Sequence, residues 1–478
     1  MSAFMLYAMV PFFWVLGLTA TAARLPMLVF SMLGLAAMYK FTDDAFGNKH
    51  ISLAVLAFGA INPWHIMQSR WALDCNMFPH LMMIGCWFLY RGIKALEDAH
   101  ISTAQPRNRK SGSRNSQALL AFNPWLAGAM VFLAFCLYAY GIALYTVPVF
   151  LFAMAVYLLA VNKELFLVPL IISFVLFMLV AWPILTFVLI NLFELPSIHF
   201  LGFTIPFFPY TTRTDDMLFF SNQPLRQLGW NARDLSRILL QQDDLPWNVI
   251  PGFGTLFMWS VPFTSLGLFS VFKSERKLSK TILLFWLAMA IYAALVVRGA
   301  NVNRVNILFY PLIILTGIGL YEAVMLAKTP AVRQLVLAIL IAVGGLSFGF
   351  FTRAYFGEHN RALSHMFFAE FLGGIEAAQE EGYDRLYVTN FIHHPNQWHL
   401  TEILVLFGAR VEPTLYWDTV AFHDRYRFRN FDDVPHLPEA GVRTLYVFNV
   451  HEAHFFPNEM FYITWVNGFG VARFRFAE

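Results

Sequence analysis

Long apolar runs separated by short polar segments make up the first three quarters of the chain. Several of these runs approach the ~20 residues that an α-helix needs to cross a bilayer. The pattern predicts ten membrane spans, at roughly 25–41, 51–66, 76–92, 118–138, 141–160, 165–190, 249–272, 281–298, 304–327 and 333–352.

From about residue 353 the apolar runs give way to shorter segments of alternating type. "FFAEFLGGIEAAQEEG" and "QWHLTEILVLFGA" have helical patterns, whereas "DRLYVTN" and "RTLYVFNV" have the patterns of strands. Such alternation is typical of a small α/β layer domain. We therefore predict three parts: a segment at 1–24, a transmembrane domain at 25–352 with a long loop at 192–248, and an α/β domain at 353–478.

The composition supports a membrane protein. Of 478 residues, 58% are hydrophobic and 13% are charged, whereas a soluble chain would carry about a quarter charged residues. The fold class that follows is mainly α, a polytopic α-helical membrane protein in contact with membrane lipids. A formal net charge of +3 is too small to indicate binding to nucleic acid. Cys75, Cys86 and Cys136 lie in or beside apolar segments, so they form neither a disulfide framework nor a zinc spacing.

Basic residues are concentrated in alternate loops. The longest of these loops, at 91–117, carries Arg107, Arg109, Lys110 and Arg114. In the loop 192–248, by contrast, acidic residues outnumber Lys and Arg. The positive-inside rule places the basic loops in the cytoplasm. The segment 64–75, the loop 192–248 and the chain after about 353 then face outward, in a multi-pass protein of the plasma membrane.

The first 24 residues lack the basic region and the cleavage site of a signal peptide, and Pro11 interrupts their apolar run. Only a few residues separate this run from the next one. An interfacial helix on the outer face fits this segment at least as well as a full span.

Arg70 and Asp74 stand four residues apart between two apolar segments. That spacing would put both side chains on one face of a continuous helix. One interpretation is a local ion pair, with Asp74 close to the N-terminus of a helix that starts near Asn76. The other is an outward-facing cavity in which the arginine holds an anionic group and the aspartate accepts from a hydroxyl.

A second candidate group lies in the short outer loop between the spans 281–298 and 304–327. It contains Arg298 and Arg304 and no acidic residue, although the other loops assigned to the outer side are not rich in basic residues. Either both arginines extend to lipid headgroups, as is common at helix ends, or they form a phosphate site.

The loop 192–248 supplies further charged candidates for substrate contact, namely Arg213, Asp215, Asp216, Asp243 and Asp244. Paired acids there could bind a divalent cation. Residues of this kind are more often solvated turn and capping positions.

Histidines are frequent in the C-terminal domain, at His393, His394, His399, His451 and His454. They could form a metal site if the fold brings them together. His451 and His454 do not have the H-E-x-x-H spacing, and surface or hydrogen-bonded histidines are the more common alternative.

Four segments together resemble the GT-C membrane glycosyltransferases, in particular the protein O-mannosyltransferase and aminoarabinose transferase group (glycosyltransferase families 39 and 83). They are "LGLTATAARLPMLVFSMLGLAAMY", "NPWHIMQSRWALDCNMFPHLMMIGCWFLY", "DDLPWNVIPGFGTLFMWSVPFTSLGLF" and "NRVNILFYPLIILTGIGLYEAV". In the second, Ser-Arg precedes a short apolar stretch, an Asp and a new span. The resemblance covers roughly residues 10–327 and rests on the order and sidedness of motifs that are individually weak.

The resemblance implies a transferase that takes a hexosyl or pentosyl group from a polyprenyl-phosphate donor to a glycan, lipid or protein acceptor on the outer face. Asp74 matches the acid that follows the Ser-Arg motif, and Arg70 matches the arginine of that motif. Together with the candidates named above, the predicted substrate-binding residues are Ser69, Arg213, Arg298, Arg304 and Asn306, of which the resemblance places Arg304 near the donor phosphate. No organic cofactor or resident metal is implied, although a divalent cation could take part.

Members of the family begin with a cytoplasmic N-terminus, a first span and an outer loop that carries the main catalytic acid. Here the Arg24-Leu25-Pro26 motif is present, but no acidic residue occurs between Met1 and Asp43. The resemblance therefore implies that the chain is truncated at its N-terminus. Two alternatives to an active transferase are a catalytically impaired fragment and a transporter or flippase of a lipid-linked substrate. Transporters often contain two-fold repeats, and none is found in this sequence.

Overall fold

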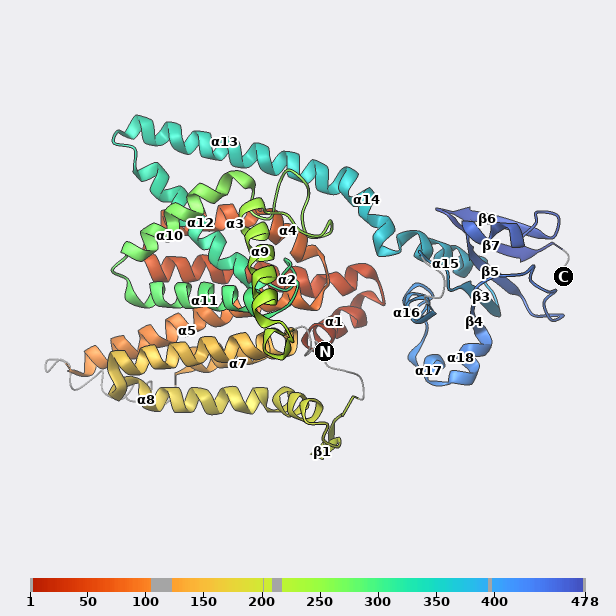
Figure 1. The fold of residues 1–478 in the computed structure, drawn as a ribbon, viewed down its shortest axis with the longest axis horizontal. Helices are drawn as coiled ribbons and strands as arrows, with labels where there is room; N and C mark the ends of the chain where they lie inside the picture. The colour runs from red at the N-terminus through yellow and green to blue at the C-terminus, as the bar shows by residue number, and fades with distance from the viewer. Residues whose placement is uncertain (1–2, 105–122, 201, 209–216, 394–397, 476–478) are drawn as a thin grey trace. The chain divides into compact units, whose positions relative to one another are not determined.

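The computed structural model describes residues 3–104, 123–200, 202–208, 217–393 and 398–475. The chain divides into two compact units, Met1–Arg353 and Ala354–Glu478 (Figure 1). The first unit is a helical bundle, and the second is a mixed α/β domain. Each unit is described by itself.

The helices of the first unit follow the apolar runs of the sequence. They are α1 (Ala3–Leu16), α2 (Ala20–Phe46), α3 (Lys49–Ile61), α4 (Pro63–Arg70), α5 (Asp74–Ala104), α7 (Pro124–Ala139), α8 (Ala143–Leu192), α9 (Pro224–Ser236), α10 (Val261–Lys273), α11 (Lys277–Val296), α12 (Phe309–Met325) and α13 (Pro330–Ala354). Short helical turns η3 (Leu218–Phe220), η4 (Arg237–Gln241), η5 (Met258–Ser260) and η6 (Asn306–Leu308) and a hairpin of β1 (Ile198–Phe200) and β2 (Phe203–Ile205) lie in the connections.

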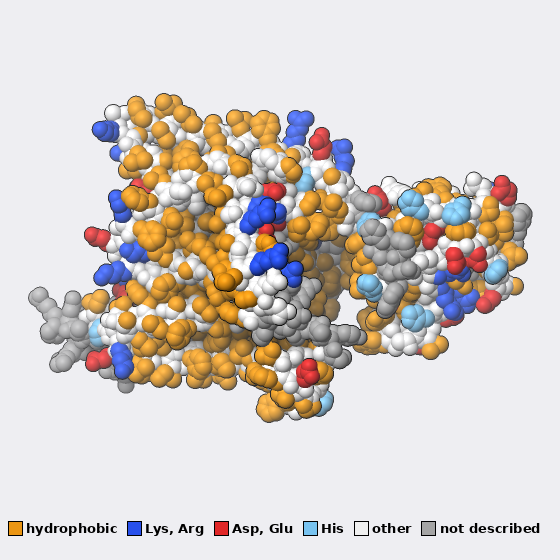
Figure 2. All heavy atoms as spheres, in the orientation of Figure 1, with side chains coloured by type: hydrophobic (Ala, Val, Ile, Leu, Met, Phe, Trp, Pro, Cys, Tyr) orange, Lys and Arg blue, Asp and Glu red, His pale blue; other side chains and the backbone are white. Residues whose placement is uncertain are grey.

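Among the described residues, five helices are long and apolar enough to cross a membrane, or six if α3 and α4, bent by 56°, form one broken span. The predicted fold class of a polytopic helical membrane protein is therefore confirmed. The predicted number of ten spans is not. Figure 2 shows that hydrophobic side chains cover much of the visible face of this unit, as expected for a surface in lipid.

Helix α8 accounts for two of the predicted spans. Its 50 residues would extend about 75 Å as a straight helix, more than twice the hydrocarbon thickness of a bilayer. The helix bends at Asn162, whose φ of −156° and ψ of 91° are not helical. The Asn162 side chain accepts a hydrogen bond from Leu165 N at 3.1 Å and so starts the second half.

Glycines allow α12 to lie directly against two neighbouring helices. A Cβ atom on Gly319 would overlap with the carbonyl oxygen of Phe263 in α10, and one on Gly267 would overlap with the carbonyl oxygen of Leu315. On another side, Gly317 faces the backbone of Val55 in α3. Small residues permit this close approach of helix backbones in membrane proteins, where burial of apolar surface contributes little to association.

The second unit has a five-stranded sheet in the order β4-β3-β5-β7-β6. The strands are β3 (Arg385–Thr389), β4 (Tyr426–Arg429), β5 (Thr444–Asn449), β6 (Phe461–Val466) and β7 (Phe469–Phe474). Strands β3, β4 and β5 are parallel, whereas β7 pairs antiparallel with β5 and β6. The helical elements are η7 (Tyr355–His359), α14 (Asn360–Ser364), η8 (His365–Phe367), α15 (Ala369–Glu381), α16 (Trp398–Gly408), α17 (Pro413–Trp417), α18 (Thr419–Arg425) and η9 (Val450–Phe455).

The predicted helix and strand alternation is confirmed in this unit. The two predicted helices are α15 and α16, and the two predicted strands are β3 and β5. Strand β5 is buried along its whole length, at the centre of the sheet, and its core neighbours include Phe371 and Ile375 of α15. The sequence reading did not identify β4, β6 and β7.

Candidate functional site

Arg70 and Asp74 belong to different helices, so the predicted shared helical face does not form. Helix α4 ends at Arg70, and Trp71 is extended, with φ −101° and ψ 108°. Helix α5 then begins at Asp74, two residues earlier than predicted. The buried side chain of Asn76 fixes the connection, because its Nδ2 donates to Trp71 O at 3.1 Å.

The Asp74 carboxylate lies at the N-terminus of a long helix. Its Oδ1 accepts a hydrogen bond from Cys75 N at 2.8 Å, and the side chain is half-buried. A negative charge is favoured there, since the first turn of a helix presents unpaired N–H groups. Arg70 is exposed, whereas the hydroxyl of the buried Ser69 donates to Ile66 O at 2.9 Å within α4.

Asn306 joins a distant segment to this helix start. It is fully buried at the beginning of η6, and its Nδ2 donates to the carbonyl of Cys75. The loop before α12 is therefore held against the first turn of α5. Asn306 is thus bound to the residue that follows Asp74, although more than 200 residues separate them along the chain.

The two arginines of this loop have different environments. Arg298 is exposed and Arg304 is half-buried. The Arg304 guanidinium donates to the carbonyl of Arg298, which closes the loop. Asn301 supports the same turn, since its Oδ1 accepts from Arg304 N at 3.0 Å.

Tyr140, in the short connection between α7 and α8, lies in the electrostatic field of these groups. Burial raises the pKa of Tyr140 above its usual range, Cys75 and Asp74 raise it further, and Arg304 lowers it. The phenol is therefore neutral at physiological pH and can donate a hydrogen bond. The sequence analysis did not single out this residue, which lies in a very short connection between two apolar runs.

Asp244 is a buried carboxylate that connects two loops. Its side chain is 1% exposed, whereas that of Asp243 is 64% exposed. Asp244 Oδ2 accepts from Val302 N at 2.6 Å and from Asn248 Nδ2 at 2.8 Å, and Oδ1 lies 3.9 Å from Arg237 Nη2. Asp244 is therefore neither a solvated turn residue nor an open substrate contact, in contrast to both interpretations of the sequence. It fixes the loop that carries Arg304.

Burial raises the pKa of Asp244 above its usual 3.8, and the hydrogen bond from Val302 N is the largest opposing effect. The Asp244 carboxyl group therefore remains protonated to a higher pH in the folded state than in the unfolded state. The resulting stability is present at low pH and is lost as the pH rises through the raised pKa. We expect the Asp244→Asn variant, which cannot ionise, to lack this decline. Thermal melts of both proteins from about pH 4 to pH 7 measure the difference.

The exposed neighbour Asp243 provides the control for this experiment. The Asp243→Asn variant should retain the pH dependence of the parent. Melting curves of the parent and of Asp244→Asn that shift in parallel with pH would contradict the assignment.

Several sequence candidates fall outside the described residues. They are Arg107, Arg109, Lys110, Arg114, Arg213, Asp215, Asp216 and His394. Within the described part of the chain, no group of three His, Cys, Asp or Glu side chains could hold a metal ion. Of the remaining histidines, His393 stacks on Phe368 and His451 stacks on Phe391.

Comparison of the structure with solved proteins identifies similar chains. No protein-family model matches this sequence, and no curated protein matches it. ArnT from Cupriavidus metallidurans bound to undecaprenyl phosphate is 13% identical, with a TM-score of 0.52, over 98% of this chain and 86% of that chain. The apo state of the same protein is 12% identical, with a TM-score of 0.55 and the same coverage. The chain has the ArnT fold.

The likeness to ArnT extends over both units, because it covers 98% of the chain. It confirms at the level of fold the resemblance to GT-C transferases that four weak sequence motifs indicated. In this ArnT-like fold, the structure brings together Asp74, Arg304, Asn306 and Tyr140 at one end of the helical unit.

Proposed function

We propose that this protein is a membrane glycosyltransferase that moves a sugar from a polyprenyl-phosphate donor to a hydroxyl of a glycan, lipid or protein acceptor. The ArnT fold supports this proposal, since one of the similar ArnT structures is bound to undecaprenyl phosphate. The observation that carries it is the contact of Asn306 with the Cys75 carbonyl, which holds the loop of Arg304 against the helix start that carries Asp74. Sugar transfer from a phosphate requires both a base and a positive charge.

In the proposed reaction, the acceptor oxygen attacks the anomeric carbon of the sugar. Asp74 accepts the proton of the acceptor hydroxyl, which is general base catalysis. The bond between the anomeric carbon and the phosphate oxygen breaks, and the electron pair leaves with the polyprenyl phosphate. Arg304 stabilises the negative charge that develops on this phosphate.

The other residues of the group have supporting roles in this proposal. Tyr140 donates a hydrogen bond to a phosphate or sugar oxygen, as its raised pKa allows. Asn306 positions Asp74 through the Cys75 carbonyl. The exposed Arg70 and Arg298 contact the donor or acceptor from the outer side.

The purified full chain in proteoliposomes allows a direct test with a panel of radiolabelled polyprenyl-phosphate hexoses and pentoses. Release of labelled sugar to an acceptor, with formation of free polyprenyl phosphate, supports the transferase. Movement of intact donor across the bilayer without cleavage of the sugar–phosphate bond would instead support a transporter. If no donor of the panel is either cleaved or moved across the bilayer, both functions are contradicted.

We expect Arg304→Ala to weaken binding of undecaprenyl phosphate by about ten- to a hundredfold, since hydrogen bonds to charged groups contribute about 1.5–3 kcal/mol. Arg304→Lys should have an intermediate effect, because lysine keeps the charge but lacks the planar fork. Titration of the detergent-solubilised protein measures the dissociation constants. Arg226→Ala is the control, since Arg226 packs on Trp230 at the surface. Unchanged affinity in Arg304→Ala would refute the phosphate assignment.

We also propose that the second unit begins on the same side of the membrane as Arg304. Helix α12 leads away from Arg304, and α13 is 25 residues long, about 37 Å, so it can return across the bilayer. The loop of Arg304 is predicted to face outward. A protease added to intact cells should then cleave within Ala354–Glu478. Protection in intact cells together with cleavage in inverted vesicles would reverse this assignment.

A further inference from the structure

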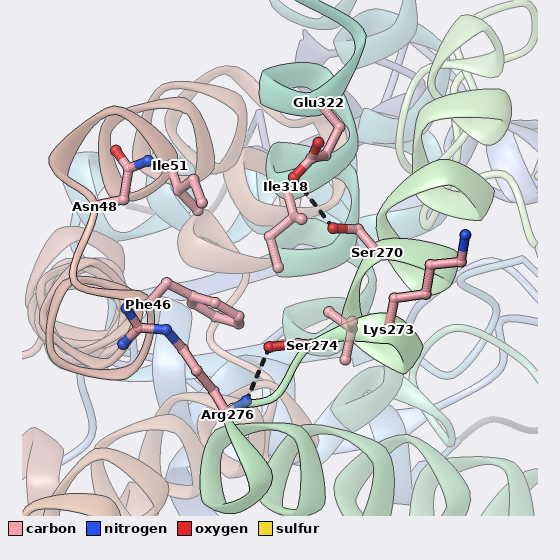
Figure 3. A pocket seen from close by; sticks show the side chains of 10 residues that line it. Phe46, Asn48, Ile51, Ser270, Lys273, Ser274, Arg276, Ile318 and Glu322 are labelled. Carbon is pink, nitrogen blue, oxygen red and sulfur yellow. Dashed lines mark hydrogen bonds between the residues drawn. The ribbon is translucent and has the colours of Figure 1, made fainter. Parts of the chain in front are cut away.

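A cavity of about 340 Å³ lies at the opposite end of the helical unit from the candidate site. It is formed where α2 connects to α3 and where α10 connects to α11, with α12 along one wall (Figure 3). Helix α11 separates the two regions: it begins next to Arg276 at the cavity and ends just before Arg298. Its 20 residues span about 30 Å, which is the thickness of the hydrocarbon core of a bilayer. The cavity is therefore a separate site near the other membrane surface.

The wall of the cavity is apolar, and its edge is polar. Phe46, Ile51, Val271 and Ile318 form the apolar part, and the last three of these are buried. Figure 3 shows Phe46, Ile51 and Ile318 pointing toward the space between the helices. A wall of this kind suits the glycerol and first acyl carbons of an amphiphile better than a fully hydrated ion.

The edge contains two cationic side chains and several hydroxyl and amide groups. Arg276 and Lys273 are exposed, and Ser274 and Asn48 lie beside them. Among the described residues, Arg276 uses Nη1 to donate to Ala45 O at 3.1 Å, and a guanidinium has five N–H donors. Lys273 Nζ lies 4.1 Å from the centre of the exposed Phe269 ring, and Figure 3 shows it directed outward from the cavity, so it contributes positive charge beside the opening.

Among the described residues that line the cavity, Glu322 is the acidic one, and its charge is compensated in part. Glu322 Oε1 accepts a hydrogen bond from Ser270 Oγ at 3.1 Å. In addition, α11 begins at this edge, and in the described structure no side chain caps its first turn. The N–H groups and the positive end of the helix dipole therefore add to the two cations.

We propose that this cavity binds the headgroup of an anionic phospholipid from the adjacent leaflet. The phosphate lies beside Arg276, within the positive field to which Lys273 adds, and the glycerol lies against the apolar wall. Basic pockets between transmembrane helices bind anionic headgroups by this combination of charge and depth. The sequence prediction that the loops containing these two residues are cytoplasmic places the site in the inner leaflet.

Native mass spectrometry of the full chain in detergent provides the test, with phosphatidylglycerol and phosphatidylcholine as probes. We expect phosphatidylglycerol to bind the parent more tightly, and each of Arg276→Gln and Lys273→Gln to weaken its binding about fivefold. Lys163→Gln is the matched control, since Lys163 is an exposed lysine at the bend of α8 and does not line the cavity. If Arg276→Gln fails to fold because it loses the contact with Ala45, Lys273→Gln alone carries the test.

Three results would overturn the proposal. Equal affinity for the two phospholipids would exclude recognition of the anionic headgroup. Equal loss of binding in Lys163→Gln and Lys273→Gln would indicate a general charge effect. Binding of glycerol 3-phosphate as tightly as phosphatidylglycerol would identify a site for a soluble phosphate instead of a lipid.

Discussion

Asp74→Asn should lower the rate of sugar transfer by about 10²- to 10⁴-fold, the usual contribution of a general base, while the protein remains folded. Asparagine has nearly the same shape as aspartate. Its side-chain oxygen can still accept the hydrogen bond from Cys75 N, and asparagine is favourable at the start of a helix. The substitution therefore keeps the structural role of residue 74 and removes its basicity.

This substitution separates the two interpretations of Asp74. If the residue only stabilises the N-terminus of α5, Asp74→Asn should transfer sugar at a rate close to that of the parent. Single-turnover transfer of a labelled sugar from its polyprenyl phosphate measures the chemical step. Glu194→Gln is the matched control, since Glu194 is an exposed carboxylate in the loop after α8. A folded Asp74→Asn protein with full activity would exclude the catalytic role.

Gly319→Ala should lower the free energy of unfolding by about 1–3 kcal/mol, the usual cost of forcing extra carbon atoms into a packed interior. The added methyl would overlap with the Phe263 carbonyl of α10, so a side-chain rotation cannot remove the conflict. The helices would have to separate and lose the contact along their length. Gly267→Ala should have a similar effect, because it faces the Leu315 carbonyl from the other helix.

A glycine-to-alanine substitution in α13 should instead raise the free energy of unfolding. No atom lies within 4 Å of the position that a Cβ on Gly345 would occupy. Gly345→Ala should therefore stabilise the protein by up to about 1 kcal/mol, because alanine has the higher helix propensity. The three variants are compared by heating each in detergent and measuring, by size exclusion, how much monodisperse protein remains at each temperature. Equal stability of Gly319→Ala and Gly345→Ala would show that the α10–α12 contact can relax.

The sequence predicted the helices of the first unit well because apolar runs are a local property. Figure 1 shows α2, α5, α11 and α13 where such runs occur. A break between the spans 51–66 and 76–92 was predicted, but its position was not, because the side chains around Trp71 and Asn76 decide it and the four-residue spacing of Arg70 and Asp74 is compatible with a continuous helix. In the second unit, the helix-like and strand-like segments were identified, whereas β6 and β7 were missed.

The candidate site was predictable only in part, because its residues meet through packing of distant segments. The sequence identified Asp74 and Arg304 as charges that are costly beside a membrane. It could not place Tyr140 beside them, since that depends on how α7 and α8 pack near the start of α5. It also could not distinguish the buried Asp244 from the exposed Asp243, two adjacent residues of one type.

The glycine contact between α10 and α12 has a consequence for biosynthesis. Residue 267 leaves the ribosome before residue 319, and at about 5–20 residues per second the roughly fifty residues between them take several seconds to translate. During this time α10 has been synthesised without the helix that packs against Gly267. The pair therefore closes only after α11 and α12 have both been inserted, which makes this contact a late step of assembly. A nascent chain that stalled before residue 319 would leave the α10 surface around Gly267 open to other helices.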